Sequence, residues 1–292
     1  MNNFIKNLKS DFKSEDNLKK LLYINIGAYL FIQVIYVLSF LLMFDSYNMF
    51  VNLTLPADYT NLIKRPWAII TYMFLHKDLL HILLNLLWLH FGGKLFLQYM
   101  NQKQLLSTYI LGGVSGALLF ILSYNLLPAF SEVTNEAIAI GASASVLAII
   151  FSSATYNPNL SINLPFIGLV KIKYIAIFIF IIDVLSIPKG NSGGHISHIG
   201  GALFGFLYVK QLQRGNDLSQ YLYSTTNYIR SLFGIKNMKK AKEQKNKTDQ
   251  QYRNQRFKKN KQIDTILEKI AASGYESLSK EEKNILFKSS KR

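Results

Sequence analysis

The chain has 292 residues, half of them hydrophobic, and it contains no cysteine. The lack of cysteine excludes a disulfide framework and any metal site built on thiolates. A formal net charge of +16 beside this apolar content argues against an ordinary soluble domain and is typical of a polytopic membrane protein with a basic, polar tail. Such a tail indicates contact with membrane lipid on the cytoplasmic side, and we expect no nucleic acid as a partner.

Six apolar segments follow one another along the chain, and each is long enough, or nearly long enough, to span a bilayer. The expected fold class is therefore an all-α polytopic membrane protein, a bundle of six transmembrane helices with a short helical cytoplasmic tail. The fourth segment is the shortest, and its first turn holds Gly, Ala and Ser in place of larger apolar residues. A short helix that begins below the membrane surface leaves room for water above it. The six segments are 22–44, 76–98, 105–127, 141–156, 170–187 and 195–213.

Basic residues mark one side of this arrangement. They precede the first segment, lie between the second and third, precede the fifth and follow the sixth. If the spans alternate in direction, the positive-inside rule places all of these connections in the cytoplasm. We therefore expect a multi-pass protein of the cell (inner) membrane with both termini cytoplasmic. Residues 45–75 are then external, with aromatic anchors such as Trp67 at the interface; a loop lying partly in the outer leaflet is the alternative.

The composition divides the chain into four parts. The first is a cytoplasmic N-terminal segment, and the second is the six-span domain. A basic linker follows, which lacks apolar periodicity over most of its length and is expected to be flexible. The last part regains helical spacing as a pair of short helices, too small for a core of their own and therefore expected to dock. The four parts are 1–21, 22–213, 214–262 and 263–292.

The C-terminal pair carries two helix-boundary signals. Gly274 is placed to stop the first helix, because glycine accepts the left-handed conformation common at helix ends. Ser279-Lys280-Glu281-Glu282 has the Ser-x-x-Glu form of a capping box, in which Ser and Glu satisfy free backbone N–H groups reciprocally. A second helix is therefore predicted to open here.

Two polar residues in apolar surroundings indicate chemistry. Ser143 begins the fourth segment and His198 lies in the sixth. A hydroxyl and an imidazole are costly to place in hydrocarbon, so each marks a candidate functional site. Together they predict a serine nucleophile and its general base. No acidic residue has a comparable position, since the sequence does not fix the depth of Asp183, and a Ser–His dyad is expected. Ser145 faces elsewhere on its helix and is interpreted as a packing residue.

The second segment supplies candidate hydrogen-bond donors. His81 and Asn85 are four residues apart and share one helix face. Donors aimed at a common point can stabilise a tetrahedral oxyanion. The alternative, which this segment by itself favours, is that the two side chains hydrogen-bond neighbouring helices.

The sixth segment carries a packing motif and a possible metal motif. Gly201 and Gly205 form a small-xxx-small pair that allows close approach of another helix, with the fourth segment as the expected partner. That contact would bring the serine within reach of His198. His195 and His198 have the spacing of a metal-binding pair, with His76, His81 or His90 as further ligands. No carboxylate accompanies them in the usual pattern, so no metal is expected.

The set His81-x-x-x-Asn85, Gly141-x-Ser143 and His198-x-x-Gly201-x-x-x-Gly205, in that order over six apolar segments, resembles the rhomboid family of intramembrane serine proteases. The resemblance covers about residues 20–213. It implies Ser143 as nucleophile and His198 as general base, with His81, Asn85 and the Ser143 backbone N–H as the oxyanion hole. It further implies a membrane-dipping loop at 45–75, no cofactor, and a transmembrane protein substrate cut near the outer end of its helix. It specifies no oligomeric state.

Three positions depart from the family pattern. The family usually has Gly after the nucleophile, where this chain has Ala144, whose methyl group could crowd the oxyanion site. A Tyr that often stacks on the catalytic His is replaced by Leu147. The first-loop Trp-Arg pair reads Trp67-Ala68, with Arg65 out of register. We expect these differences to affect substrate preference and rate more than the chemistry.

Two other classes of protein are alternatives to a protease. A catalytically silent relative that binds transmembrane clients generally lacks the Ser or the His, whereas this chain keeps both. A transporter is expected to show inverted repeats, or broken helices with charges at the midplane. The chain has no convincing repeat, and the sequence therefore favours the protease.

Overall fold

The computed structural model describes residues 16–164, 167–232 and 262–290. The chain divides into two compact units, residues 1–226 and 227–292. Most of the predicted N-terminal segment and the greater part of the predicted linker lie outside the described residues.

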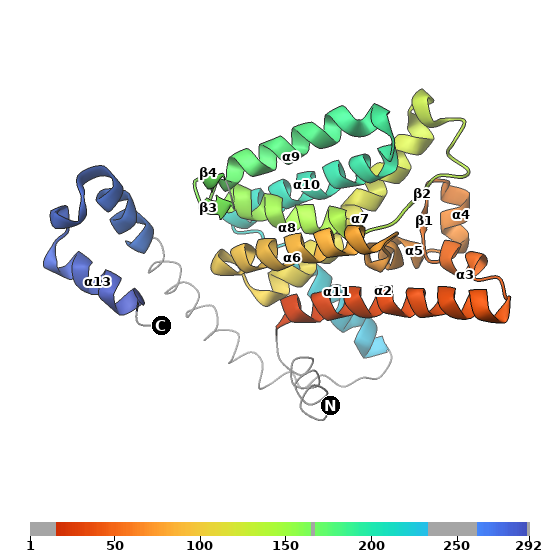
Figure 1. Ribbon diagram of the computed structural model, residues 1–292, viewed down its shortest axis with the longest axis horizontal. Coiled ribbons are helices and arrows are strands. Elements are labelled where there is room, and N and C mark those ends of the chain that lie inside the picture. Colours follow the sequence, from red (N-terminus) through yellow and green to blue (C-terminus); the bar gives the residue numbers. More distant parts are fainter. Residues whose placement is uncertain (1–15, 165–166, 233–261, 291–292) are drawn as a thin grey trace. The chain divides into compact units, whose positions relative to one another are not determined.

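Helices cover all six apolar segments in the first unit (Figure 1). By length and composition, three of the helices in the described ranges could cross a membrane: α2, α6 and α7. Helix α8 is apolar but shorter. The six-span count therefore stays a prediction. The six helices are α2 (Asn17–Leu42), α6 (Leu79–Tyr99), α7 (Gln102–Leu126), α8 (Ser143–Tyr156), α9 (Ile172–Ser186) and α10 (Ser192–Gln213).

Polar caps set the helix starts. Helix α2 begins five residues before the predicted span because Asp16 accepts a hydrogen bond from the backbone N–H of Lys19 at 3.0 Å. Helix α6 begins later than predicted, after Asp78, whose side chain accepts from the His81 N–H at 2.8 Å. A cap satisfies N–H groups that have no partner within the helix, and it acts independently of the apolar pattern.

The predicted flexible linker is wrong over its first part. Residues Ser219–Leu232 form helix α11. Asp217 fixes the start of this helix, accepting from the Ser219 N–H at 2.9 Å and from the Tyr208 hydroxyl at 3.1 Å. It also accepts from the Gln104 side chain at 3.0 Å. The first turn of α11 is therefore tied to α7 and α10, a long-range contact that local composition does not reveal.

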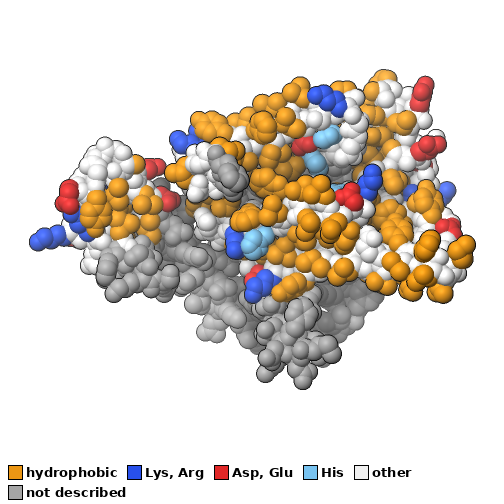
Figure 2. Space-filling model, viewed as in Figure 1, with side chains coloured by type: hydrophobic (Ala, Val, Ile, Leu, Met, Phe, Trp, Pro, Cys, Tyr) orange, Lys and Arg blue, Asp and Glu red, His pale blue; other side chains and the backbone are white. Residues whose placement is uncertain are grey.

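The outer surface of the first unit is strongly apolar. Figure 2 shows hydrophobic side chains spread over the visible face along α2, α6 and α9. Phe31, Phe40, Leu80 and Phe178 are each at least 60% exposed. Exposed apolar surface on this scale marks contact with lipid or with another protein. Together with the three long apolar helices, it identifies a membrane protein.

Close helix packing forms the centre of the first unit. Helix α10 packs against both α7 and α8. A Cβ atom at Gly201 would overlap the backbone carbonyl of Ala144, and one at Gly205 would overlap the carbonyl of Ala148. The predicted packing of the sixth segment on the fourth is therefore confirmed.

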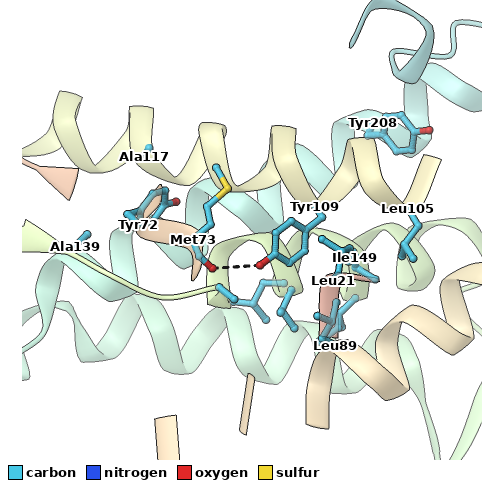
Figure 3. Close-up of a cluster of buried hydrophobic side chains, with 14 of the residues drawn as sticks. Leu21, Tyr72, Met73, Leu89, Leu105, Tyr109, Ala117, Ala139, Ile149 and Tyr208 are labelled. Atoms are coloured by element: carbon cyan, nitrogen blue, oxygen red, sulfur yellow. Dashed lines mark hydrogen bonds between the residues drawn. The ribbon is translucent and has the colours of Figure 1, made fainter. Parts of the chain in front are cut away.

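Tyrosine hydroxyls tie the first loop to this core. Figure 3 shows Tyr72, Met73 and Tyr109 among the buried side chains. The Tyr109 hydroxyl donates to the carbonyl of Met73 at 3.2 Å, and the Tyr72 hydroxyl donates to the carbonyl of Gly113 at 2.6 Å. The end of the loop before α6 is thus held against α7.

The loop at 45–75 is built of short elements. The Arg65 guanidinium donates to the carbonyl of Val51 at 2.6 Å, and the Trp67 indole N–H donates to the carbonyl of Asn52 at 2.9 Å. These bonds join the second half of the loop to its first half. The elements are α3 (Tyr47–Val51), β1 (Leu55–Pro56), α4 (Tyr59–Lys64), α5 (Ala68–Thr71) and η1 (Tyr72–Phe74).

Two small antiparallel sheets connect the helices. Strand β1 pairs with β2 (Ile138–Ala139), so the first loop meets the segment that leads into α8. Strands β3 (Ser161–Leu164) and β4 (Gly168–Lys171) form a hairpin between α8 and α9. Among the described residues of this unit, the remaining short helices are η2 (Pro128–Phe130) and η3 (Ile187–Lys189).

The second unit contains a helix at 262–273, then η4 (Tyr275–Ser277) and α13 (Lys280–Ser290). Gly274 ends the first helix with φ of +76°, as predicted, and its N–H donates to the carbonyl of Ile270 at 2.9 Å. Both bonds of the predicted capping box are present: the Ser279 N–H donates to Glu282 Oε2 at 2.7 Å, and the Glu282 N–H donates to Ser279 Oγ at 3.2 Å.

Candidate active site

The polar residues of α6, α8, α9 and α10 meet at one end of the bundle. Helices α6, α8 and α10 run in the same direction and α9 runs back beside them (Figure 1). The start of α8, which carries Ser143, therefore lies at the same level as the early turns of α6 and α10 and the last turns of α9. This shared level is what the predicted alternation of the spans requires.

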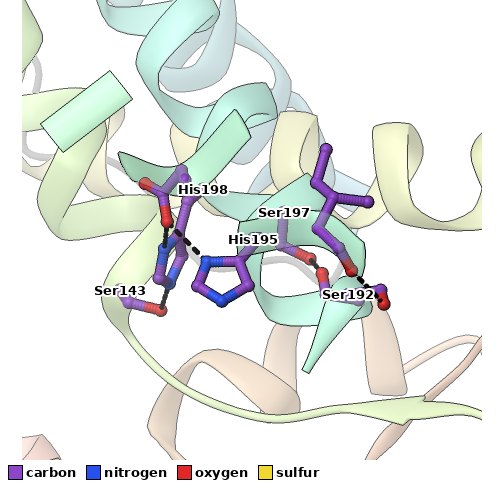
Figure 4. A network of polar contacts seen from close by, with 8 residues as sticks. Ser143, Ser192, His195, Ser197 and His198 are labelled. Carbon is purple, nitrogen blue, oxygen red and sulfur yellow. Dashed lines mark hydrogen bonds and ion pairs between the residues drawn. The ribbon is translucent and has the colours of Figure 1, made fainter. Parts of the chain in front are cut away.

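Ser143 and His198 are in direct contact. Ser143 Oγ lies 2.6 Å from His198 Nε2, and Figure 4 shows the hydroxyl pointing at the imidazole ring. The close packing of α8 on α10 explains the short distance. Gly201 is one turn beyond His198, and it contacts the backbone of Ala144, the residue after Ser143. A serine hydroxyl within hydrogen-bond reach of an imidazole is the geometry of an activated nucleophile.

Asp183 is the residue that sequence reasoning missed. Its Oδ1 atom lies 2.8 Å from Nδ1 of His198 and 2.8 Å from Nδ1 of His195. The expectation that no carboxylate accompanies the histidine is wrong. The sequence did contain a signal for Asp183, since an acidic residue in an apolar segment marks a candidate functional site. The depth of Asp183 in the bundle, however, depends on how α9 packs against α10.

The distances among Asp183, His195 and His198 bear on the alternative that these residues bind a metal ion. Ligand atoms of Asp183, His195 and His198 lie within 4.8 Å of one another. Two ligands of one tetrahedral zinc ion, each about 2.1 Å from the metal, lie roughly 3.4 Å apart. The two 2.8 Å separations fit hydrogen bonds from ring N–H groups to a carboxylate better than they fit ligation. This group does not include the other histidines that the structure describes, His76, His81 and His90.

His81 presents a proton to the site. Its Nδ1 atom accepts the backbone N–H of Lys77 at 3.4 Å, which assigns the ring proton of the neutral imidazole to Nε2. A Cβ built on Gly141 would lie 3.0 Å from that Nε2 and 3.5 Å from Ser143 Oγ. The Nε2–H of His81 therefore faces the space beside the serine.

Asn85 lies one turn further along α6. Its amide nitrogen donates to the carbonyl of His81 at 2.9 Å. An amide carries two N–H donors, so this bond leaves a second one. The bond to His81 is within the same helix and not to a neighbouring helix, which weakens the alternative that Asn85 serves to hold helices together.

The turn into α8 requires glycine. Gly141 has φ of +130°, and its N–H donates to the carbonyl of Tyr72 at 2.9 Å. This backbone conformation is rare for residues with a side chain, and any Cβ here would also press on His81. Ser143 is the first residue of α8, where the N–H groups of the first turn have no partner within the helix. Those groups favour negative charge beside the hydroxyl.

A cavity of about 660 Å³ contains these groups. Ser143, His198, His81, Asn85 and Asp183 all line it. The remaining wall is mostly apolar and comes from α6, α8 and α9, with a contribution from β2. Its apolar residues include Leu84, Trp88, Val146, Leu147, Phe178, Ile179 and Ile182.

The three residues that depart from the family pattern, Ala144, Leu147 and Ala68, lie in different parts of the structure. The methyl group of Ala144 faces α7, where a Cβ on Gly116 would lie 2.6 Å from it, and Ala144 does not line the cavity. Leu147 lines the cavity. Ala68 is fully buried.

Ser145 is also fully buried, and its hydroxyl has no hydrogen-bond partner among the described residues. This supports the interpretation of Ser145 as a packing residue.

Comparison with known proteins agrees with this geometry. RHOMBOID-like protein 12, mitochondrial, of Arabidopsis thaliana is 27% identical over 157 residues, covering 51% of this chain and 47% of that protein. The chain thus spans about half the length of this relative. Residues 246–292 match a family of unknown function, DUF6576. The rhomboid domain model matches residues 64–214, slightly more than half of the chain. That match includes the serine, both donors on α6 and the α10 histidine, and the chain belongs to the rhomboid family.

Proposed function

We propose that the protein is an intramembrane serine endopeptidase that cleaves peptide bonds in or near transmembrane helices of other membrane proteins. The observation that carries the proposal is the 2.6 Å contact between Ser143 Oγ and His198 Nε2 inside a cavity lined by two further donors. Membership of the rhomboid family supports the same reaction class.

The reaction proceeds in two steps. Ser143 Oγ attacks the scissile carbonyl carbon while His198 Nε2 takes the hydroxyl proton. The tetrahedral oxyanion accepts hydrogen bonds from His81 Nε2–H, the second Asn85 N–H and the backbone N–H of Ser143. His198 then gives its proton to the leaving amine, which departs and leaves an acyl-serine. Water attacks that ester with His198 again as base, releasing the acid and restoring Ser143.

The surroundings of the cavity support a substrate that comes from the membrane. Leu84 on α6 and Phe178 and Ile182 on α9 line the cavity, and each is more than 40% exposed. An apolar segment can therefore leave lipid and remain on apolar surface as it approaches Ser143. A peptide carbonyl becomes accessible only where the helix unwinds, so small or helix-breaking residues near the cleavage site favour cutting.

The orientation proposed is multi-pass in the cell membrane, with both termini in the cytoplasm. The distribution of Lys and Arg supports it. In this orientation, the site opens toward the external side, and water reaches the acyl-enzyme from there.

Cleavage of a single-span substrate by the purified protein in detergent tests the proposal. The comparison is wild type against Ser143→Ala, His198→Ala and Ser145→Ala. The last is a matched control, since it removes a buried hydroxyl two residues away that makes no hydrogen bond among the described residues. We expect cleavage by wild type and Ser145→Ala, and loss by at least about 10³-fold in the other two.

Folded wild-type protein that cleaves none of several substrates would contradict the proposal. It would favour instead a silent rhomboid-fold protein that binds transmembrane clients. Cleavage retained in Ser143→Ala but lost in Ser145→Ala would show that the nucleophile is assigned wrongly.

A further inference from the structure

One carboxylate oxygen serves two imidazoles. Asp183 Oδ1 lies 2.8 Å from Nδ1 of both His195 and His198. The Asp183 side chain is only 8% exposed, and each histidine side chain is 21% exposed. Figure 4 shows His195 beside His198, with their rings close together; the rings are nearly perpendicular, with centroids 5.9 Å apart. The arrangement uses one residue of α9 and two of α10.

This geometry fixes the tautomer of His198. An ionised carboxylate can only accept hydrogen bonds, so the proton of each neutral ring lies on Nδ1. Nε2 of His198 then carries a lone pair, which faces the Ser143 hydroxyl at 2.6 Å. The opposite tautomer would place a proton between Nε2 and the hydroxyl and could not act as a base. Asp183 thus selects the form of His198 that the proposed reaction requires.

We propose that Asp183 is a positioning residue that extends the dyad to a Ser143–His198–Asp183 relay, and that His195 holds the carboxylate in place. The inference rests on the proposed proteolysis. When His198 takes the serine proton it becomes an imidazolium, and the adjacent carboxylate stabilises that charge without taking a proton itself.

There is a physical reason for His195 to contact Asp183 in addition to His198. A carboxylate that is largely removed from water needs more than one donor to offset its desolvation. His195 supplies the second N–H from the same helix, one turn before His198. The hydrogen bond to Asp183 orients the His198 ring toward Ser143.

Asp183→Asn is the principal variant, because it removes the charge while keeping size and shape. With a single-span substrate in detergent we expect kcat to fall by about 10²- to 10⁴-fold, with KM changed by less than about threefold. A purely structural role would lower thermal stability without this split between kcat and KM.

Two variants at His195 separate hydrogen bonding from packing. His195→Asn places an amide N–H close to the position of Nδ1, whereas His195→Leu fills similar space without a donor. We expect His195→Leu to lower kcat by about 10-fold, as loss of a supporting hydrogen bond does in other sites, and His195→Asn to recover most of it. Equal losses in the two variants would overturn the role of His195 as a donor.

A spectroscopic measurement tests the relay without proteolysis. The chain has five histidines, and selective ¹⁵N labelling allows the Nδ1–H proton of His198 to be assigned. In Ser143→Ala, which is inactive by design, we expect a low-field Nδ1–H signal that disappears in Ser143→Ala/Asp183→Asn. If both proteins lack the signal, the inference is wrong even where wild type cleaves. If Asp183→Asn cleaves as wild type does while Ser143→Ala does not, the relay is wrong and the proposed function stands.

Discussion

Gly201 of α10 lies so close to the backbone carbonyl of Ala144 that no side chain fits between them. Ala144 follows Ser143, and Gly201 follows His198 by three residues. The contact therefore sets the distance between the hydroxyl and the imidazole through backbone packing, one turn away from the chemistry.

Gly201→Ala tests this relationship. The added methyl group must push α8 and α10 apart, because the atom it meets is backbone and cannot rotate away. We expect a loss of about 1–3 kcal/mol in stability, with cleavage reduced well beyond the loss of folded protein. Thermal unfolding and kcat in detergent measure the two effects.

Gly27→Ala is the matched control for that substitution. Gly27 lies within α2, and a Cβ there would meet no atom within 4 Å. The same chemical change should leave activity unaltered and stabilise the helix by up to about 1 kcal/mol. A Gly201→Ala protein that is as active as Gly27→Ala would contradict the packing argument.

Asn85→Ala and His81→Ala test the two donors of α6. Each is expected to lower kcat by about 10²- to 10³-fold, because each removes a hydrogen bond that forms only when the oxyanion develops. KM should change little. Steady-state kinetics on one substrate provide the measurement, with Asn48→Ala, an exposed change on α3, as control. If the substitutions alter only thermal stability, the donors serve packing instead.

Ala144→Gly tests the direction of the Ala144 methyl group. The methyl packs toward Gly116 of α7 and not into the cavity. Restoring the residue usual in the family should therefore leave kcat within about twofold and destabilise the helix by roughly 1 kcal/mol. Ala28→Gly in α2 gives the same loss of helix propensity at a distant position. A large gain in kcat for Ala144→Gly alone would show that the methyl crowds the site after all.

Glu282 makes the capping box of the second unit dependent on pH. Hydrogen bonding from the Ser279 N–H, followed by the contact with Lys269, lowers the pKa of Glu282 below its ordinary value. A lowered pKa means that the stabilisation is complete above the ordinary glutamate pKa and is lost as the pH falls through the lowered pKa.

Amide exchange at Ser279 measures this effect in the full chain. Protection of the Ser279 N–H, corrected for its intrinsic exchange rate, should fall at acidic pH in wild type. In Glu282→Gln it should be lower at neutral pH and should not change over that acidic range. Protection that falls equally in both proteins would indicate general unfolding of the unit.

The sequence by itself determined where the helices lie and which residues carry polar groups into them. The length of the apolar stretches located all six segments, and the small-xxx-small pair at Gly201 and Gly205, with the small residues that open the fourth segment, predicted which two helices pack closely. The capping box at Ser279 was readable because it depends on residues three apart. Signals of this kind are local, since they act within one or two turns of a single helix.

The tertiary structure alone decided how the helices are rotated and at what depth they meet. Asp183 could not be assigned from its position in α9, because its distance to His198 depends on how two helices pack. The direction of the Ala144 methyl group and the anchoring of α11 by Asp217 have the same cause. Rotation and depth come from the fit of side chains between helices, which no single segment of sequence contains.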